Sequence, residues 1–208
     1  MKPVSTNILS YADFLENETR KTSTVTKIAY TIEEKKDEEK PKYDYGCVMS
    51  YFEFPEMQDL HNKIEKEDLL EEDKSLETEP HVTLLYGLHS DEIEDDEVMK
   101  SVNKDEIKNL KLINLSAFNN KDADVLKFDV EGDGLYSNNQ NLTKFPHTNE
   151  YDYHPHATVA YLKPGTAEKY IEMFKGIEYS VEPTRIVYSK PEGEILESLI
   201  KQENNENS

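Results

Sequence analysis

The stretch PHVTLLY at Pro80–Tyr86 is matched by the stretch PHATVAY at Pro155–Tyr161, and both follow the pattern Pro-His-x-Thr-apolar-apolar-Tyr. Each is rich in β-branched, aromatic and other apolar residues, a composition that favours strands. Because successive side chains of a strand point to opposite faces, one face of each strand is apolar and the other carries the histidine and the threonine. The repeat therefore predicts two equivalent strands, each with one face in the core and one polar face.

The polar faces of the two strands carry the residue types that phosphodiester cleavage requires. If the strands lie side by side about a pseudo-twofold axis, His81, Thr83, His156 and Thr158 face one cleft. One neutral imidazole can remove a proton from the attacking oxygen, and one imidazolium can protonate the leaving oxygen. The threonine hydroxyls can donate hydrogen bonds to the non-bridging phosphate oxygens. The set predicts a catalytic site that needs no metal and no cofactor.

Two other interpretations of the motifs stay open. In the first, each histidine ends a strand and each threonine is an ordinary strand residue, which is the better account of either motif alone. The second is a metal site, because His154 and His156 are spaced like two ligands on one strand face, with His147 and Asp152 nearby. However, His81 has no such partner, and a His-x-His pair alone is a weak metal signal. The matched pair favours the catalytic interpretation.

The rest of the chain predicts helices and strands in a mixed order. Apolar spacing and turn residues give, in chain order, a strand at Tyr43–Phe54, a helix through Met57, Leu60 and Ile64, a strand at His81–Leu88, an acidic helix capped by Ser90, and strands at Leu112–Phe118 and Val125–Val130. There follow a polar loop at Glu131–Gln140 with a possible helical turn before Pro146, a strand at His156–Leu162, a helix capped by Thr166, and a strand at Ile177–Tyr188 that is interrupted or bent at Pro183. Short polar turns favour an antiparallel α+β fold. No glycine-rich phosphate loop is present, which excludes a P-loop NTPase and a Rossmann protein.

The two ends of the chain differ from its middle. Residues 1–42 contain a possible short helix at Asn7–Leu15 and the charge run EEKKDEEK at Glu33–Lys40, which has nothing to bury. They predict a flexible N-terminal arm. The folded domain is expected over residues 43–191, and residues 192–208 are expected to form a polar C-terminal tail.

The composition excludes several classes of function. Of the 208 residues, 44 are acidic and 24 are basic, and the resulting net charge of -20 repels duplex DNA and anionic membranes. The single cysteine, Cys47, cannot form an internal disulfide, which fits a reducing compartment. The sequence shows no signal segment and no apolar run of membrane-spanning length. We expect a soluble cytoplasmic protein that binds no long nucleic acid.

The two motifs, HVTL at His81–Leu84 and HATV at His156–Val159, resemble the paired His-x-Thr/Ser-apolar motifs of the 2H phosphoesterase superfamily. The phrases PHVTLLYGLH, LTKFPHTN and HPHATVAYLKPG are similar to one branch of it, the anti-CBASS phosphodiesterases of tailed phages. The resemblance implies a bilobal α+β fold with two antiparallel sheets, pseudo-twofold symmetry around a central cleft, and helices outside. It covers about Tyr43 to Pro191.

The resemblance also implies a substrate. An enzyme of this branch would cleave 3′–5′ linkages of cyclic di- or trinucleotide second messengers, such as 3′,3′-cGAMP, in a bacterial host cell and so counteract CBASS antiviral immunity. His81 and His156 would form the catalytic pair, with Thr83 and Thr158 as their partners. Two alternatives stay open. A 2H enzyme that acts on 2′,3′-cyclic phosphate ends of RNA would have the same four motif residues. The N-terminal arm suggests instead a protein that sequesters cyclic nucleotides without cleaving them. The sequence does not indicate the oligomeric state.

The resemblance further implies contacts to the bases. An aromatic residue near the N-terminal strand would stack on one base, which suggests Tyr45 or Tyr51, and an acidic residue beyond the second motif would contact a base, which suggests Glu182 or Glu192. Because the chain is acidic, basic side chains near the cleft would have to attract an anionic substrate. The candidates are Lys144, Lys163, Arg185 and Lys190.

Overall fold

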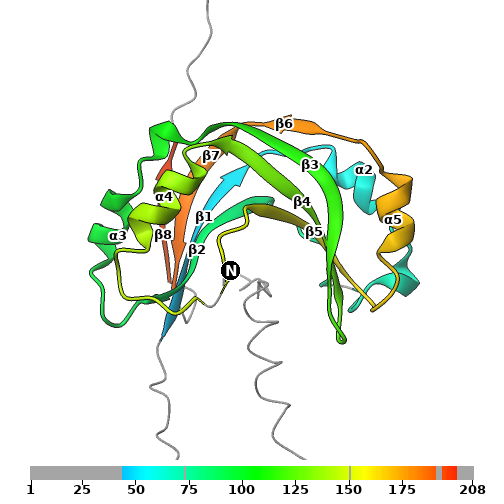
Figure 1. Ribbon diagram of the computed structural model, residues 1–208, viewed down its shortest axis with the longest axis horizontal. Helices are drawn as coiled ribbons and strands as arrows, with labels where there is room; N and C mark the ends of the chain where they lie inside the picture. Colours follow the sequence, from blue (N-terminus) through cyan, green and yellow to red (C-terminus); the bar gives the residue numbers. More distant parts are fainter. Residues whose placement is uncertain (1–43, 73, 150, 191–193, 201–208) are drawn as a thin grey trace, which may run out of the picture. The chain divides into compact units, whose positions relative to one another are not determined.

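The computed structural model describes residues 44–72, 74–149, 151–190 and 194–200. The expected N-terminal arm and Glu192 lie outside the described residues. In chain order the elements are β1 (Tyr45–Phe52), α2 (Met57–His61), β2 (His81–His89), α3 (Asp95–Ser101), β3 (Lys108–Asn119), β4 (Asp124–Asp133), α4 (Leu135–Leu142), β5 (His156–Leu162), α5 (Glu168–Met173), β6 (Tyr179–Val181), β7 (Pro183–Ser189) and β8 (Ile195–Leu199), with short 3-10 turns at Lys66–Asp68 and Lys104–Glu106 (Figure 1).

The strands form two antiparallel sheets of four strands each. Sheet A has the order β2-β1-β7-β8, and sheet B has the order β5-β4-β3-β6. Every strand pair in both sheets is antiparallel. The predicted antiparallel α+β fold with two sheets is therefore confirmed.

The chain repeats one β-α-β-α-β unit, and the two units exchange their third strands. The first unit runs β1-α2-β2-α3-β3 and the second runs β4-α4-β5-α5 and then, after the short β6, β7. β3 pairs with β4 of the second unit, and β7 pairs with β1 of the first unit. The equivalent strands β2 and β5 are each an edge strand of their sheet, and these two edge strands contact each other. The exchange produces the expected pseudo-twofold arrangement.

Each sheet is covered by one helix from each unit. α4 packs against β2, and α3 packs against α4 and β8, so this pair covers sheet A. α2 packs against β5 and α5 packs against β3, so these two cover sheet B. Figure 1 shows the two helix pairs at opposite ends of the sheets, with the helices outside.

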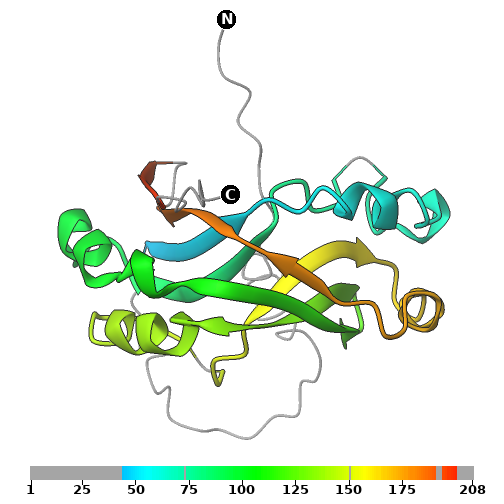
Figure 2. The ribbon, with the colours of Figure 1, turned by 90° about the horizontal axis from the view of Figure 1, so that it is seen from above.

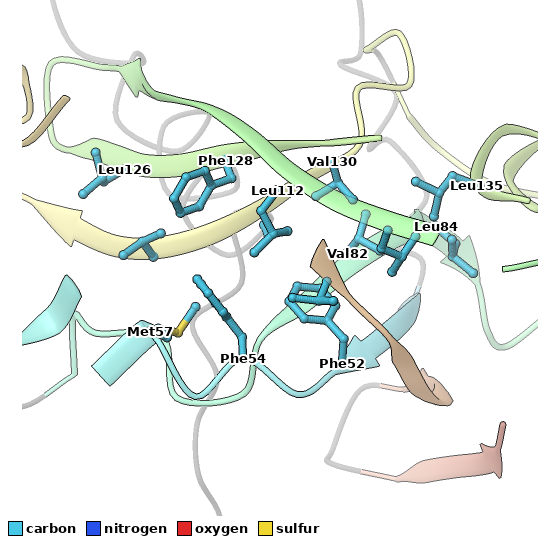
Figure 3. Close-up of a cluster of buried hydrophobic side chains, with 14 of the residues drawn as sticks. Phe52, Phe54, Met57, Val82, Leu84, Leu112, Leu126, Phe128, Val130 and Leu135 are labelled. Carbon is cyan, nitrogen blue, oxygen red and sulfur yellow. The ribbon is translucent and has the colours of Figure 1, made fainter. Parts of the chain in front are cut away.

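The apolar faces of the strands meet in one large core cluster. The expected alternation is confirmed in both motif strands, because Val82 and Leu84 on β2 and Ala157 and Val159 on β5 are at most 1% exposed. Figure 3 shows how aromatic and aliphatic side chains from both sheets and from α2 and α4 interleave in this cluster. Burying each such side chain contributes about 1.5–3 kcal/mol. The apolar faces of the motif strands thus hold these strands in the core, and the polar faces with the histidines and threonines are not needed for that packing.

Two expected helix caps are absent from the described helices α3 and α5. The Ser90 hydroxyl donates to the Asp44 carbonyl at 2.6 Å, and α3 begins five residues later. The Thr166 hydroxyl donates to the Lys163 carbonyl at 2.8 Å, which closes the turn before α5. Each hydroxyl satisfies a local carbonyl instead of a helix amide, a common competing use of these residue types.

The polar loop expected at Glu131–Gln140 is wrong. β4 continues to Asp133, and α4 starts after Gly134, whose φ of 74° turns the chain. The helix hides its polar residues by bonding them: the Asn138 amide donates to the Gly134 carbonyl at 2.8 Å, and the Asn139 amide donates to the Leu84 carbonyl at 2.7 Å. Buried amides that are fully bonded can replace apolar side chains on the inner face of a helix.

The last predicted strand, Ile177–Tyr188, is two strands in different sheets. β6 pairs with β3 in sheet B, whereas β7 begins at Pro183 and pairs with β1 in sheet A. Proline has no amide hydrogen and is suited to the first position of a strand, where the chain changes partners. Figure 2 shows this segment crossing from one sheet to the other beside β3. β8 pairs with β7, so sheet A extends into the segment expected to form the tail.

The end of β2 is hydrogen-bonded to Thr148, in the segment that precedes the second motif. Gly87 has φ of 88°, and its carbonyl accepts the Thr148 amide at 2.8 Å. A Cβ atom on Gly87 would lie 2.1 Å from the Thr148 carbonyl oxygen. Glycine is required here both for the backbone conformation and for the close approach.

We expect Gly87→Ala to destabilise the protein more than the matched change Gly165→Ala. Gly165 also has a positive φ, of 83°, but a Cβ atom there would meet nothing within 4 Å. The control, Gly165→Ala, should lower the free energy of unfolding only by the conformational cost of about 1–2 kcal/mol for a non-glycine residue at positive φ. Urea unfolding measures both, and equal losses for the two variants would show that the Thr148 contact does not constrain β2.

Candidate active site

The two motif histidines begin the two edge strands that face each other. His81 is the first residue of β2 and His156 is the first residue of β5. β2 and β5 contact each other, and the charge of His81 is close enough to lower the pKa of His156. The structure therefore places the two histidines on contacting edge strands of two different sheets, rather than on neighbouring strands of one sheet.

The two histidines are held by the same hydrogen bond. Nδ1 of His81 lies 2.8 Å from the Glu79 carbonyl oxygen, and Nδ1 of His156 lies 2.8 Å from the His154 carbonyl oxygen. A carbonyl only accepts, so Nδ1 must carry the hydrogen in both rings. In the neutral ring the lone pair is then on Nε2, the nitrogen that can take or return a proton. This arrangement presets both rings for acid–base chemistry.

The motif threonines follow their histidines on the same strand faces. Thr83 is half-buried and lies opposite Met49 on β1, and Thr158 is buried and lies opposite Lys127 on β4. The neighbouring residues Val82 and Leu84 on β2, and Ala157 and Val159 on β5, are buried in the core. Each threonine therefore lies two residues after its histidine on an edge strand.

Around His81, sheet A contributes an aromatic ring and a cation. The rings of Tyr51 and His81 are 5.2 Å apart, and the Arg185 guanidinium lies 4.4 Å from the centre of the Tyr51 ring. Arg185 Nη2 donates to Glu79 Oε1 at 3.1 Å, and Glu79 is the residue whose carbonyl orients His81. Burial, followed by the nearby Glu79 carboxylate, raises the pKa of Tyr51, which stays neutral. Glu79 thus connects the cation to the histidine.

Around His156, sheet B contributes the same chemistry from other positions. The rings of Phe118 and His156 are 5.0 Å apart and nearly perpendicular, and Lys127 Nζ lies 4.8 Å from the centre of the Phe118 ring. Lys127 forms an ion pair with Asp129, and Asp129 Oδ1 also accepts from His154 Nε2 at 3.0 Å. His154 is the residue whose carbonyl orients His156.

The two halves are alike in chemistry although they differ in register. In each half the residue two positions before the histidine orients the ring with its carbonyl and connects, through its side chain, to a cation that lies on an aromatic ring. The position opposite His81 is Tyr51, whereas the position opposite His156 is Asp129. Lys127 and Arg185 are therefore not related by the repeat. The two units reach the same arrangement by different residues.

His156 is neutral at physiological pH. Burial is the main reason that the pKa of His156 falls to about 4, and the hydrogen bond to the His154 carbonyl opposes this shift. The positive charges of Lys127, His154 and His81 lower the pKa further. A neutral imidazole with its lone pair on Nε2 can accept a proton, which suits the role of a general base.

Of the three suggested base-contact residues that the structure describes, Tyr51 is the one whose ring contacts a motif histidine. Its ring is 5% exposed and lies between His81 and Arg185, so it supports the histidine more than it offers a face. Tyr45 is six residues earlier on β1, roughly 20 Å away along the strand, where its ring pairs with Tyr86 and His89 at 6.1 Å. Glu182 is exposed in the one-residue link between β6 and β7.

Of the four suggested cations, Arg185 lies at the site and the three lysines have partners elsewhere. Lys144 donates to Asn141 Oδ1 at 2.9 Å, and Lys163 donates to the Glu67 carbonyl. Lys190 pairs with Asp95 and Glu194 at 2.9 and 3.2 Å. Sequence reasoning missed Lys127, Asp129 and Phe118. A signal was present in the segment DVLKFDV, where two charged residues, two positions apart, interrupt one face of an apolar strand.

In the described part of the chain, no group of three or more histidine, cysteine, aspartate or glutamate side chains is placed to hold a metal ion. The described helices are too short or too polar for any of them to cross a bilayer.

The fold is similar to solved structures of phosphoesterases. Neither a protein-family model nor a curated protein sequence matches the chain. A structure titled as a phosphoesterase is 14% identical, with 74% of this chain and 95% of the other covered and a TM-score of 0.39. E. coli LigT complexed with 3′-AMP is 14% identical, with 76% and 97% covered and a TM-score of 0.40. The same protein complexed with phosphate is 14% identical, with 76% and 96% covered and a TM-score of 0.38.

At TM-scores below 0.5 these likenesses do not decide what the chain does. Its own residues supply two imidazoles with preset tautomers and two hydroxyls on the edge strands β2 and β5, and two cations on the inner strands β4 and β7. Such a set can transfer protons to and from a substrate and stabilise developing negative charge.

We expect the imidazole of His156 to titrate well below the ordinary histidine value of about 6.5, with Nδ1 protonated near pH 7. Nitrogen-detected NMR of the histidine rings across pH 3–8 measures both properties, and a His156→Asn variant assigns the signals. A pKa near the ordinary value, or a hydrogen on Nε2 of the neutral ring, would contradict the described environment.

Proposed function

We propose that the chain is a metal-independent phosphodiesterase that cleaves 3′–5′ linkages of cyclic di- or trinucleotides such as 3′,3′-cGAMP. The observation that carries the proposal is the matched pair of histidines, each held through Nδ1 by a backbone carbonyl at 2.8 Å and each followed by a threonine on the same face. One proton acceptor and one proton donor on opposite sides of a phosphate are sufficient for an in-line displacement.

The low pKa of His156 supports its role as the base. In the proposed step, His156 Nε2 takes the proton of a ribose 2′-hydroxyl, and the 2′-oxygen attacks the neighbouring phosphorus. The bond between phosphorus and the 5′-oxygen breaks, and His81 in its protonated form gives its proton to that oxygen. The product is a linear oligonucleotide that ends in a 2′,3′-cyclic phosphate. Thr83 and Thr158 donate hydrogen bonds to the non-bridging oxygens as their charge increases.

The surroundings of the two histidines support a small ligand with several bases and phosphates. Phe118 is half-buried beside His156, and its ring makes this part of the site aromatic. Lys127 supplies a cation beside His156 that can attract a phosphate. The net charge of -20 disfavours long RNA, whose many phosphates would be repelled. A compact cyclic dinucleotide avoids that repulsion. The resemblance of the sequence phrases to the phage enzymes suggests a role in removing a defence signal.

The cleavage of 3′,3′-cGAMP in the presence of EDTA tests the proposal. Wild type is expected to produce a linear dinucleotide, whereas His81→Ala and His156→Ala should each lose about 10²–10⁴-fold in rate, because each removes one partner of the acid–base pair. His147→Ala is the matched control and should keep its rate, since the His147 ring bonds the Phe145 carbonyl outside the site. Chromatography of the digests measures all four proteins. Activity that disappears with EDTA, or persists in both site variants, would contradict the proposal.

The same assay separates the alternatives. An oligoribonucleotide with a 2′,3′-cyclic phosphate end that is consumed while 3′,3′-cGAMP stays intact would replace the proposed substrate with RNA ends. Binding of 3′,3′-cGAMP in calorimetry without any cleavage would replace the enzyme with a sequestering protein.

A further inference from the structure

A buried lysine lies on the catalytic face of sheet B. Lys127 is 4% exposed, an unusual state for a lysine. It lies opposite Thr158, and two residues later Asp129 lies opposite His156. Directly opposite residues of an antiparallel pair point to the same face. Lys127, Asp129, His156 and Thr158 therefore form one group on adjacent strands.

The charge of Lys127 is only partly offset by its surroundings. Asp129 accepts from the Lys127 ammonium with the same oxygen that accepts from His154. An ammonium has three hydrogens to donate, and the electron-rich face of Phe118 stabilises it from a second side at 4.8 Å. A buried cation that shares its carboxylate with another donor has a strong attraction for an added anion.

Arg185, on the other sheet, is in a different position. Its guanidinium faces two carboxylates, with Glu79 at 3.1 Å and Glu197 at 3.7 Å. These two negative charges offset its positive charge. Of the two cations near the histidines, Lys127 is therefore the one whose charge can act on a bound phosphate.

We propose that Lys127 is a catalytic residue that holds a non-bridging phosphate oxygen of the substrate between His156 and Thr158, and that Asp129 and His154 are positioning residues for it. This inference rests on the proposed phosphodiesterase function. It adds a residue outside both motifs, contributed by β4, to the four that the motifs contain. The ammonium would stabilise the charge that develops on the phosphate as the 2′-oxygen attacks.

The charge of Lys127 also affects the protonation state of His156, the proposed base. The charged and titratable groups that face His156 are Lys127 and Asp129 from β4, His154 from the preceding loop, and His81 from β2. Lys127 disfavours a second positive charge on His156, so the free site holds the imidazole neutral. When a phosphate binds to Lys127, its negative charge offsets the ammonium, and the pKa of His156 rises. The base therefore becomes stronger only when substrate is present.

The variants Lys127→Met and Lys127→Arg test the inference, with Lys100→Met as the control. Methionine keeps the length of the side chain and removes the charge, and arginine keeps the charge. Lys100 is an exposed lysine on α3 whose ion-pair partner is Asp96, so its loss controls for removal of one positive charge. Thermal unfolding shows whether each variant is folded.

Three readouts are expected to change together in Lys127→Met. The kcat for 3′,3′-cGAMP should fall by about 10²–10³-fold, the effect of removing one donor to a developing oxyanion. Binding of adenosine 3′-monophosphate, measured by calorimetry, should weaken at least tenfold. The acid limb of the pH–rate profile should move to higher pH, because the pKa of His156 rises when the neighbouring positive charge is removed. Lys127→Arg should retain part of the binding, and Lys100→Met should match wild type.

A folded Lys127→Met protein that keeps kcat and nucleotide binding within twofold of wild type would overturn the inference. If that variant does not fold, the wild-type protein still decides: the Lys127 side-chain signals in a lysine-labelled sample must shift when adenosine 3′-monophosphate is added, and unchanged signals would overturn the inference. If wild type binds the nucleotide through Lys127 but cleaves no cyclic dinucleotide, the proposed function fails while the assignment of Lys127 stands.

Discussion

The exchange of the third strand between the two repeated units determines where everything else lies. β3 completes the sheet of the second unit and β7 completes the sheet of the first, so β2 and β5 are left at the sheet edges that contact each other. A strand in the middle of a sheet has neighbours on both sides, whereas these two edge strands can present their first residues to one another. His81 and His156 begin facing strands because two equivalent strands, 75 residues apart in the chain, occupy edges that contact each other.

The two nearly equivalent histidines differ in their electrostatic surroundings. Both rings are anchored in the same way through Nδ1, but their cations differ. Arg185 is offset by two carboxylates, whereas Lys127 shares a single carboxylate with His154 and keeps its field directed at His156. A repeat by itself would give two identical groups, and two identical imidazoles cannot prefer different protonation states. In the proposed mechanism, the unmatched residues around His156 distinguish it as the base.

The sequence predicted the parts of the structure that depend on short periodic patterns. The alternation in the two motifs fixed the faces of β2 and β5, because strand geometry is local. It predicted an interruption or bend at Pro183 but not that the two pieces join different sheets, since the residues of a strand do not specify its pairing partners. It also missed α4, whose inner face is built from the bonded amides of Asn138 and Asn139. Lys127 on β4 and Phe118 on β3 were missed because no motif repeats in these two strands.

The pH dependence of kcat/KM for 3′,3′-cGAMP, measured in the presence of EDTA, tests the central claim most directly. A pair of histidines that acts as base and acid requires one neutral and one protonated ring, so the profile should be bell-shaped and independent of the chelator. Its acid limb should reflect His156, whose pKa in the free protein is about 4. A flat profile, or activity that depends on a metal that EDTA removes, would contradict a two-histidine mechanism.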